Sequence, residues 1–80
     1  MKIYRPNGRC NASGIQVRLM REKAGLSQEQ LAAKIQLAGL NITQKAISRI
    51  ETGDRVVADY ELLFLADALN VNVCLLLGIE

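Results

Sequence analysis

The chain lacks histidine and tryptophan, and its 80 residues include one proline, two cysteines, two tyrosines and one phenylalanine. Without histidine, it has neither the most common metal ligand nor the usual acid–base group near neutral pH. The scarcity of aromatics argues against a binding cleft built from flat rings. No apolar run reaches the roughly 18 residues of a membrane-spanning helix, and the first residues lack the apolar centre of a signal peptide.

The two cysteines, Cys10 and Cys74, lie too far apart to resemble a metal-binding cluster or a disulfide framework. We therefore expect reduced thiols in a cytoplasmic protein, with no metal or other cofactor. No nucleophile–base pair, glycine-rich phosphate loop or paired carboxylates is evident, so we do not expect an enzyme. No small-molecule ligand and no membrane partner are evident either.

The net charge of +2 conceals an asymmetry along the chain. All ten lysines and arginines lie in residues 1–55, which carry a net charge of +6, whereas residues 56–80 hold four acids and no base. A basic half favours a polyanionic partner such as nucleic acid. The alternative at this point is a solvated basic surface without a partner.

Half of the residues are hydrophobic, which is enough for one small core. Residues 1–13 contain Pro6 and an Asn7-Gly8 pair, both typical of turns, and we expect a flexible N-terminal arm there. The remainder predicts five short helices, over about 14–24, 28–37, 44–52, 60–69 and 73–77. Residues 14–80 are therefore expected to form one compact all-α domain.

Each predicted helix begins after a residue whose oxygen can accept a hydrogen bond from the first turn. These residues are Ser13, Ser27, Thr43, Asp59 and Asn72. Two of them, Ser13 and Ser27, are followed three residues later by glutamine, the pattern of a reciprocal capping box. On the second helix the spacing predicts that Leu31, Ile35 and Ala38 face the core.

The predicted helix over 44–52 has two chemically different faces. Its polar face carries an amide, an amine, a hydroxyl and a guanidinium, from Gln44, Lys45, Ser48 and Arg49. Its apolar face carries Ala46, Ile47 and Ile50. Arginine and lysine can pair with guanine, and glutamine with adenine, in the major groove of DNA. Many surface helices are amphipathic without such a role, but the capped helix before it gives the order of a helix-turn-helix unit.

Three runs of sequence resemble a known family. They are Val-Arg-Leu-Met-Arg-Glu-Lys-Ala-Gly-Leu-Ser-Gln-Glu-Gln-Leu-Ala at 17–32, Ile-Ser-Arg-Ile-Glu-Thr-Gly at 47–53, and Leu-Ala-Asp-Ala-Leu-Asn-Val at 65–71. Together they resemble the helix-turn-helix domain of phage-repressor type, the lambda repressor and Cro group often called the Xre family. The resemblance covers about residues 15–79. It implies a compact five-helix lambda-repressor-like fold that binds double-stranded DNA.

The resemblance also implies a role for each matching position. The side chains that read bases would be Gln44, Lys45, Ser48 and Arg49. The contacts to DNA phosphates would come from Ser27, Gln28, Thr43, Gly53 and Arg55. Arg21 would form a structural ion pair with Glu51, and the alternative is that these are two independent solvated charges.

The chain departs from the family pattern in two places. Residues 36–42 lengthen the stretch between the two central helices, which predicts an added turn on the second helix and a wider connection. Apolar side chains stand at Phe64, Cys74 and Leu75, where family members often carry polar ones, and they predict a dimer interface. The alternative is that they pack against the N-terminal arm through Ile3 or Tyr4.

We therefore expect a sequence-specific transcriptional regulator, a repressor that acts as a homodimer on a two-fold DNA site. The alternative function is that of a protein-binding module, of antitoxin or anti-repressor type, which uses the apolar C-terminal helix.

Overall fold

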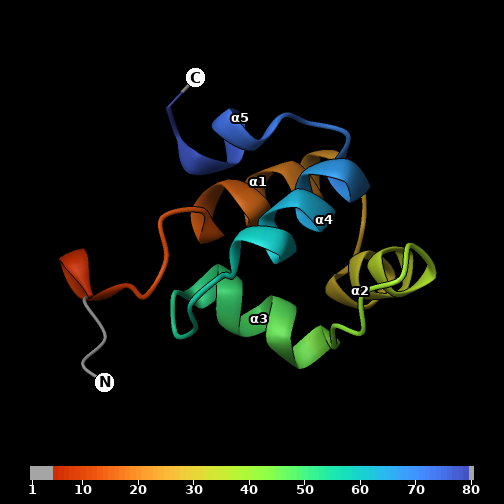
Figure 1. The fold of residues 1–80 in the computed structure, drawn as a ribbon, viewed down its shortest axis with the longest axis horizontal. Coiled ribbons are helices and arrows are strands. Elements are labelled where there is room, and N and C mark those ends of the chain that lie inside the picture. The colour runs from red at the N-terminus through yellow and green to blue at the C-terminus, as the bar shows by residue number, and fades with distance from the viewer. Residues whose placement is uncertain (1–4, 80) are drawn as a thin grey trace.

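The computed structural model describes residues 5–79, which form a short 3-10 turn followed by five α-helices (Figure 1). After the turn η1 (Pro6–Gly8), the helices are α1 (Gly14–Lys23), α2 (Gln28–Leu37), α3 (Gln44–Thr52), α4 (Asp59–Leu69) and α5 (Val73–Leu77). No strand occurs within residues 5–79. The predicted all-α class is confirmed, and the helix bounds agree with those predicted to within one residue.

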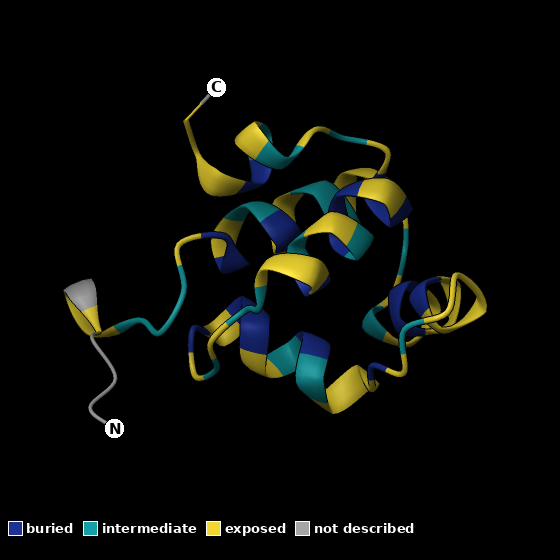
Figure 2. Ribbon diagram, viewed as in Figure 1, coloured by how far each residue is buried: buried dark blue, intermediate teal, exposed yellow. Residues whose placement is uncertain are grey.

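The core lies between the helices, and each helix contributes to it. The fully buried large side chains are Val17 of α1, Leu31 and Ile35 of α2, Ile47 and Ile50 of α3, Leu65 of α4 and Leu76 of α5. α3 packs against α1 and α2, while α5 packs against α1 and α4. Figure 2 shows the buried side of each helix turned toward its neighbours. Because burial of apolar surface drives this packing, Ile47 and Ile50 determine which face of α3 points outward.

Three of the predicted helix caps are confirmed. The Ser27 hydroxyl accepts from the Gln30 N–H at 3.0 Å, and the Gln30 side chain accepts from the Ser27 N–H at 2.8 Å. This reciprocal pair begins α2. The Thr43 hydroxyl accepts from the Ala46 N–H, and the side-chain oxygen of Asn72 accepts from the Leu75 N–H. The start of α3 is therefore fixed by the residue that precedes it in the sequence, Thr43.

The cap predicted at Ser13 is wrong. Ser13 has helical backbone angles and makes no side-chain cap hydrogen bond. Instead, the Asn11 side-chain oxygen accepts from the N–H of Gly14, the first residue of α1, at 2.8 Å. A capping residue needs an extended backbone, which Ser13 does not have.

The cap predicted at Asp59 is also wrong, because Asp59 is the first residue of α4. Ala58 stands at the cap position, and its N–H donates to the Glu61 carboxylate at 2.9 Å. Ala38 does not face the core either, because it is exposed directly after α2, which ends at Leu37 as predicted. Of residues 36–42, the first two belong to α2 and the others form the connection to α3, which the buried side chain of Ile42 holds against the core.

The helices of residues 5–79 are all too short, or too polar, to cross a membrane.

Candidate nucleic-acid interface

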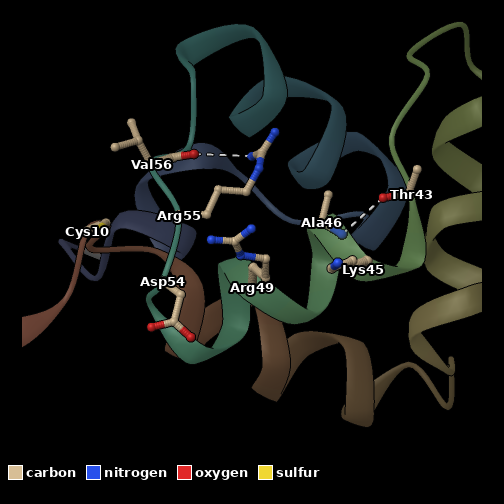
Figure 3. A pocket seen from close by; sticks show the side chains of 8 residues that line it. All are labelled: Cys10, Thr43, Lys45, Ala46, Arg49, Asp54, Arg55 and Val56. Atoms are coloured by element: carbon tan, nitrogen blue, oxygen red, sulfur yellow. Dashed lines mark hydrogen bonds between the residues drawn. The ribbon is translucent and has the colours of Figure 1, made fainter.

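The outward face of α3 carries the four side chains that the sequence predicted. Gln44, Lys45 and Arg49 are exposed and Ser48 is half-buried. Lys45 and Arg49 line a hollow of ≈ 570 Å³ beside α3, together with Arg55 and the carboxylate of Asp54 from the loop that follows the helix, so the lining includes three cations and one anion. Figure 3 shows Arg49 reaching from α3 toward that loop. Cationic groups gathered at an open hollow attract an anion such as a phosphate.

A buried ion pair supports α3 from behind. The Arg21 guanidinium donates to both carboxylate oxygens of Glu51, at 2.6 and 3.0 Å, and their side chains are only 12% and 4% exposed. Arg21 also donates to the Leu26 carbonyl at 2.8 Å, which ties α1 to the turn before α2. The hydrogen bond to Glu51 raises the pKa of Arg21, against the smaller opposing effect of burial. The guanidinium therefore stays charged, and the pair implied by the resemblance is present in the structure.

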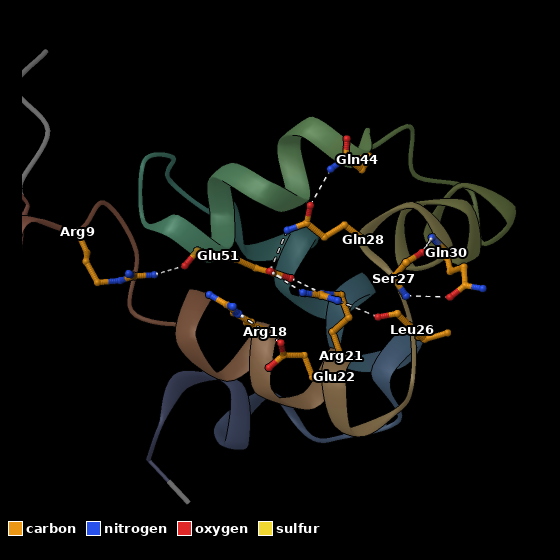
Figure 4. A network of polar contacts seen from close by, with 10 residues as sticks. All are labelled: Arg9, Arg18, Arg21, Glu22, Leu26, Ser27, Gln28, Gln30, Gln44 and Glu51. Atoms are coloured by element: carbon orange, nitrogen blue, oxygen red, sulfur yellow. Dashed lines mark hydrogen bonds and ion pairs between the residues drawn. The ribbon is translucent and has the colours of Figure 1, made fainter.

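Two glutamines connect this ion pair to the outer face of α3 (Figure 4). The Gln28 amide nitrogen donates to the Glu51 carboxylate at 3.0 Å, and the Gln28 oxygen accepts from the Gln44 amide nitrogen at 2.6 Å. An ionised carboxylate only accepts hydrogen bonds, so Gln28 has to turn its nitrogen inward and its oxygen toward Gln44. Gln44 consequently has its own oxygen and one N–H left for a partner.

The predicted phosphate contacts are placed unequally. Ser27 and Thr43 are exposed, and each uses its hydroxyl oxygen as a helix cap while retaining a proton to donate. Gln28 is half-buried and holds Gln44, a role that the sequence did not predict. Gly53 is buried, and a Cβ added there would lie 2.8 Å from the Arg9 guanidinium carbon. The Arg9 side chain thus covers the position expected to approach a phosphate.

Arg55 is held by Glu61 at the start of α4. Its two terminal nitrogens donate to the two carboxylate oxygens at 2.9 and 2.7 Å, and its side chain remains 31% exposed. The hydrogen bonds from Arg55, together with one from the Ala58 N–H, hold the pKa of Glu61 below its ordinary value, although burial opposes them. The pair fixes the loop that forms one wall of the hollow.

This pKa shift predicts an acid-dependent contribution to stability. A carboxylate whose pKa is lower in the folded state stabilises the fold above its unfolded pKa, and the contribution is lost as the pH falls through the folded pKa. Glu61→Gln should lower the unfolding free energy by about 2 kcal/mol near neutral pH, and the deficit should shrink on acidification. Urea unfolding at about pH 7 and about pH 2.5 measures this. Asp67→Asn, an exposed carboxylate on the same helix, is the control, and a pH-independent deficit for Glu61→Gln would contradict the account.

The three residues of the predicted dimer interface differ in exposure. Phe64 is half-buried against the core, Leu75 is half-buried, and Cys74 is exposed. More exposed apolar side chains lie near them in the sequence, including Leu63 at 62% and Ile79 at 72%. Ile3, Tyr4 and Lys2 lie outside the described residues. The dimer interface remains a prediction.

Two residues that contact α3 were not predicted from the sequence. Arg9 and Asn11 hydrogen-bond to backbone carbonyls at its C-terminal end. They lie about forty positions earlier in the chain, and no local spacing marks a contact over that distance. The predicted flexible arm over residues 1–13 thus includes a segment that is hydrogen-bonded to the domain, and its flexibility remains untested.

Among residues 5–79, no three histidine, cysteine, aspartate or glutamate side chains are grouped so that they could hold a metal ion. A family model described as helix-turn-helix matches residues 17–76, from within α1 to within α5. No curated protein and no solved structure matches the chain. The family match covers α2, the connection and α3 entirely, and so includes each of the four candidate base-reading residues.

Proposed function

The chain belongs to the helix-turn-helix family of lambda repressor and Cro type, a family of DNA-binding regulators, and we propose that it is a sequence-specific repressor. In this proposal α3 lies in the major groove. The supporting observation is the orientation of α3: Ile47 and Ile50 are fully buried, so Gln44, Lys45 and Arg49 point outward. An α-helix with such a face fits the width of the major groove.

We assign adenine to Gln44. Its free oxygen and free N–H are adjacent, and adenine presents a donor at N6 beside an acceptor at N7. The hydrogen bond from Gln44 to Gln28 restricts the amide before DNA arrives, which lowers the conformational entropy lost on binding. Arg49 and Lys45 have only donors, and guanine offers two acceptors, O6 and N7, in the same groove. Ser48 lies between these positions and completes the proposed base-reading set.

The phosphate contacts of the proposal flank α3. Ser27 and Thr43 offer hydroxyl protons at the starts of α2 and α3, and Arg55 offers the exposed part of its guanidinium from the loop after α3. Contacts of this kind set the position of the protein on DNA without reading its sequence. We leave Gly53 out of this set because it is buried under Arg9.

Repression would follow from occupancy of the DNA site by the protein. We propose a homodimer formed through Phe64, Cys74 and Leu75, which places two copies of α3 on a two-fold site with half-sites about one helical turn apart. Such a dimer would cover a promoter and exclude the polymerase. We also propose that this happens in the cytoplasm, where DNA is accessible and where Cys10 and Cys74, which are unpaired in the structure, stay reduced.

Selection of double-stranded oligonucleotides from a random pool tests the proposed function. The proposal expects a short enriched sequence with two-fold symmetry, and it expects the Arg49→Ala protein to lose preference at one base pair in each half-site. Recovery of no preferred sequence, at a salt concentration where the protein binds DNA, would contradict sequence-specific reading. The salt concentration has to be held fixed because phosphate contacts dominate affinity.

Gln28→Ala separates two roles for Gln28. If the residue positions Gln44, the variant should lose about 1–2 kcal/mol of discrimination at the base pair read by Gln44 and little elsewhere. If it contacts a phosphate, as the sequence predicted, all duplexes should bind more weakly by a similar factor. Measuring affinities for the selected duplex and for its single-base variants distinguishes the two, and Gln30→Ala, which changes the neighbouring cap, is the control.

Leu75→Glu tests the proposed dimer. A charge in an apolar interface leaves an unpaired carboxylate, so the variant should be monomeric by light scattering and should bind a full two-fold site at least about tenfold more weakly. Ala33→Glu, which adds the same charge at an exposed position on α2, away from the proposed interface, is the control. A mass unchanged by Leu75→Glu would remove these residues from the interface.

The alternative function, a protein-binding module, is supported by the exposed apolar side chains of α4 and the C-terminal end, such as Leu63 and Ile79. An exposed apolar patch on a small domain often marks association with another protein. The two functions separate on Arg49→Ala, which should weaken DNA binding and leave binding through α4 and α5 unchanged.

A further inference from the structure

The C-terminal end of α3 is bound by a segment near the N-terminus of the chain, Arg9–Asn11, which we call the strap. The Arg9 guanidinium donates to the Glu51 carbonyl at 2.9 Å (Figure 4), and to the Thr52 carbonyl at 3.4 Å. The Cys10 N–H donates to the Gly53 carbonyl at 2.8 Å. The last carbonyls of a helix have no partner within the helix, and a cation favours the negative end of its dipole. The strap supplies hydrogen-bond donors for these carbonyls and a positive charge at the end of the helix.

Asn11 joins three parts of the fold through one side chain. Its amide nitrogen donates to the carbonyls of Ile50 and Arg55, at 3.0 and 2.7 Å, and its oxygen accepts from the N–H of Gly14 at 2.8 Å. The end of α3, the loop after it and the start of α1 are thereby held together. Both amide protons are used, so no other residue type of this size can make the same set of bonds.

Two glycines leave room for the strap. A Cβ added to Gly14 would clash with the Ile50 carbonyl oxygen and lie 2.6 Å from an Arg9 nitrogen. A Cβ added to Gly53, whose φ is +82°, would lie 2.8 Å from the Arg9 guanidinium carbon. Atoms this close would have to move, so the close approach of the strap to α3 depends on both glycines.

The two ends of α3 are therefore held through different groups. Gln44, at the N-terminal end, is linked through Gln28 to the side chain of Glu51, whereas the strap binds backbone carbonyls. The C-terminal turn begins at Arg49, and the strap binds the carbonyls of the residues directly after it. Helix ends fray when their backbone groups lack partners. The N–H groups of Gly53 and Asp54 also cap this turn, at the carbonyls of Ile50 and Arg49. Without the strap, the carbonyls of Glu51 and Thr52 would lose their partner, and the turn from which Arg49 extends would be held less firmly.

We propose that Arg9 and Asn11 are specificity-determining positioning residues, which set how Arg49 meets its base pair. This inference rests on the proposed function, because it needs α3 to read DNA. It does not require either residue to touch the duplex. The Cys10 contribution to the hollow that contains Arg49 agrees with this placement, since it puts the strap beside the reading surface.

The test compares affinities for the selected duplex and for duplexes changed at one base pair. Arg9→Ala and Asn11→Asp should each lower discrimination about tenfold at the base pair that Arg49→Ala identifies, and less than about twofold at the Gln44 base pair. Asn11→Asp keeps the shape and the acceptor for Gly14 but turns a carboxylate oxygen toward two carbonyls. Gln28→Ala should give the opposite pattern, a loss at the Gln44 base pair alone.

Two further proteins make the result interpretable. Arg18→Ala removes an exposed arginine on α1 whose ion pair within residues 5–79 is with Glu22, so it controls for the loss of one positive charge. Arg9→Lys keeps the charge at the helix end and should recover most of the discrimination lost in Arg9→Ala. Circular dichroism at the assay temperature shows whether each variant is folded, and Asn11→Asp carries the test alone if Arg9→Ala does not fold.

Unchanged discrimination in the strap variants would overturn the inference. An equal loss at every base pair would overturn it too, because that pattern belongs to a phosphate contact or to general loss of the fold. A wild-type protein that selects no sequence would overturn the proposed function and this inference with it, whereas a selected sequence with insensitive strap variants would overturn the inference alone.

Discussion

Replacing Glu51 with alanine should lower the free energy of unfolding by about 3–5 kcal/mol, the usual range for breaking a buried ion pair from one side. Glu51 accepts from Arg21 and from Gln28, and the Arg21 side chain is almost as buried as its partner. The variant would leave a guanidinium without its carboxylate inside the fold. Urea unfolding followed by circular dichroism measures the loss.

The same ion pair can be removed from both sides as a control. Because hydrophobic replacement of a whole buried pair is often neutral or stabilising, Arg21→Met combined with Glu51→Leu should recover most of the stability lost in Glu51→Ala. Asp54→Ala breaks an exposed pair with Arg5, whose atoms are 3.7 Å apart, and should cost less than about 1 kcal/mol. A Glu51→Ala protein as stable as Asp54→Ala would show that the buried pair does not support α3.

The second large effect is expected on DNA. Combining Gln44→Ala with Arg49→Ala should cost about 4 kcal/mol on the selected duplex, roughly 1,000-fold in affinity, because each side chain contributes discrimination of about 1–3 kcal/mol. The two residues are five positions apart on α3, and the hydrogen bond that holds Gln44 does not involve Arg49, so their effects should roughly add. Binding to random-sequence DNA should change far less.

Fluorescence anisotropy with labelled duplexes at fixed salt measures both affinities. Lys34→Ala with Arg18→Ala is the matched control, since it removes two exposed cations from α1 and α2. The control should weaken both duplexes by a similar, small factor. If the Gln44→Ala, Arg49→Ala protein still preferred the selected duplex by more than about a hundredfold, reading by these residues would be excluded.

The helices and the outward face of α3 were predictable because they depend on local patterns. Three caps were predicted correctly because the residue before the helix carries a side-chain oxygen and has an extended backbone, at Ser27, Thr43 and Asn72. The caps at Ser13 and Asp59 failed because the path of the chain into α1 and α4 decides which residue can turn back on the first amides. That path is set by tertiary contacts, and no local sequence pattern predicts it.

The supports of α3 were only partly predictable. The pairing of Arg21 with Glu51 followed from the resemblance to the family, not from spacing. The hydrogen bond from Gln44 to Gln28 and the contacts of Arg9 with the end of α3 join residues 16 to 43 positions apart. Such contacts depend on how the helices pack, and a single sequence does not specify them pair by pair.

The central claim is that DNA contacts the exposed polar face of α3, and amide-resolved NMR titration of the labelled protein with the selected duplex tests it most directly. The account predicts that the largest chemical-shift changes occur in α3, around Gln44 to Arg49, and at the start of α2. Changes concentrated in α4 and α5, with α3 unperturbed, would contradict it.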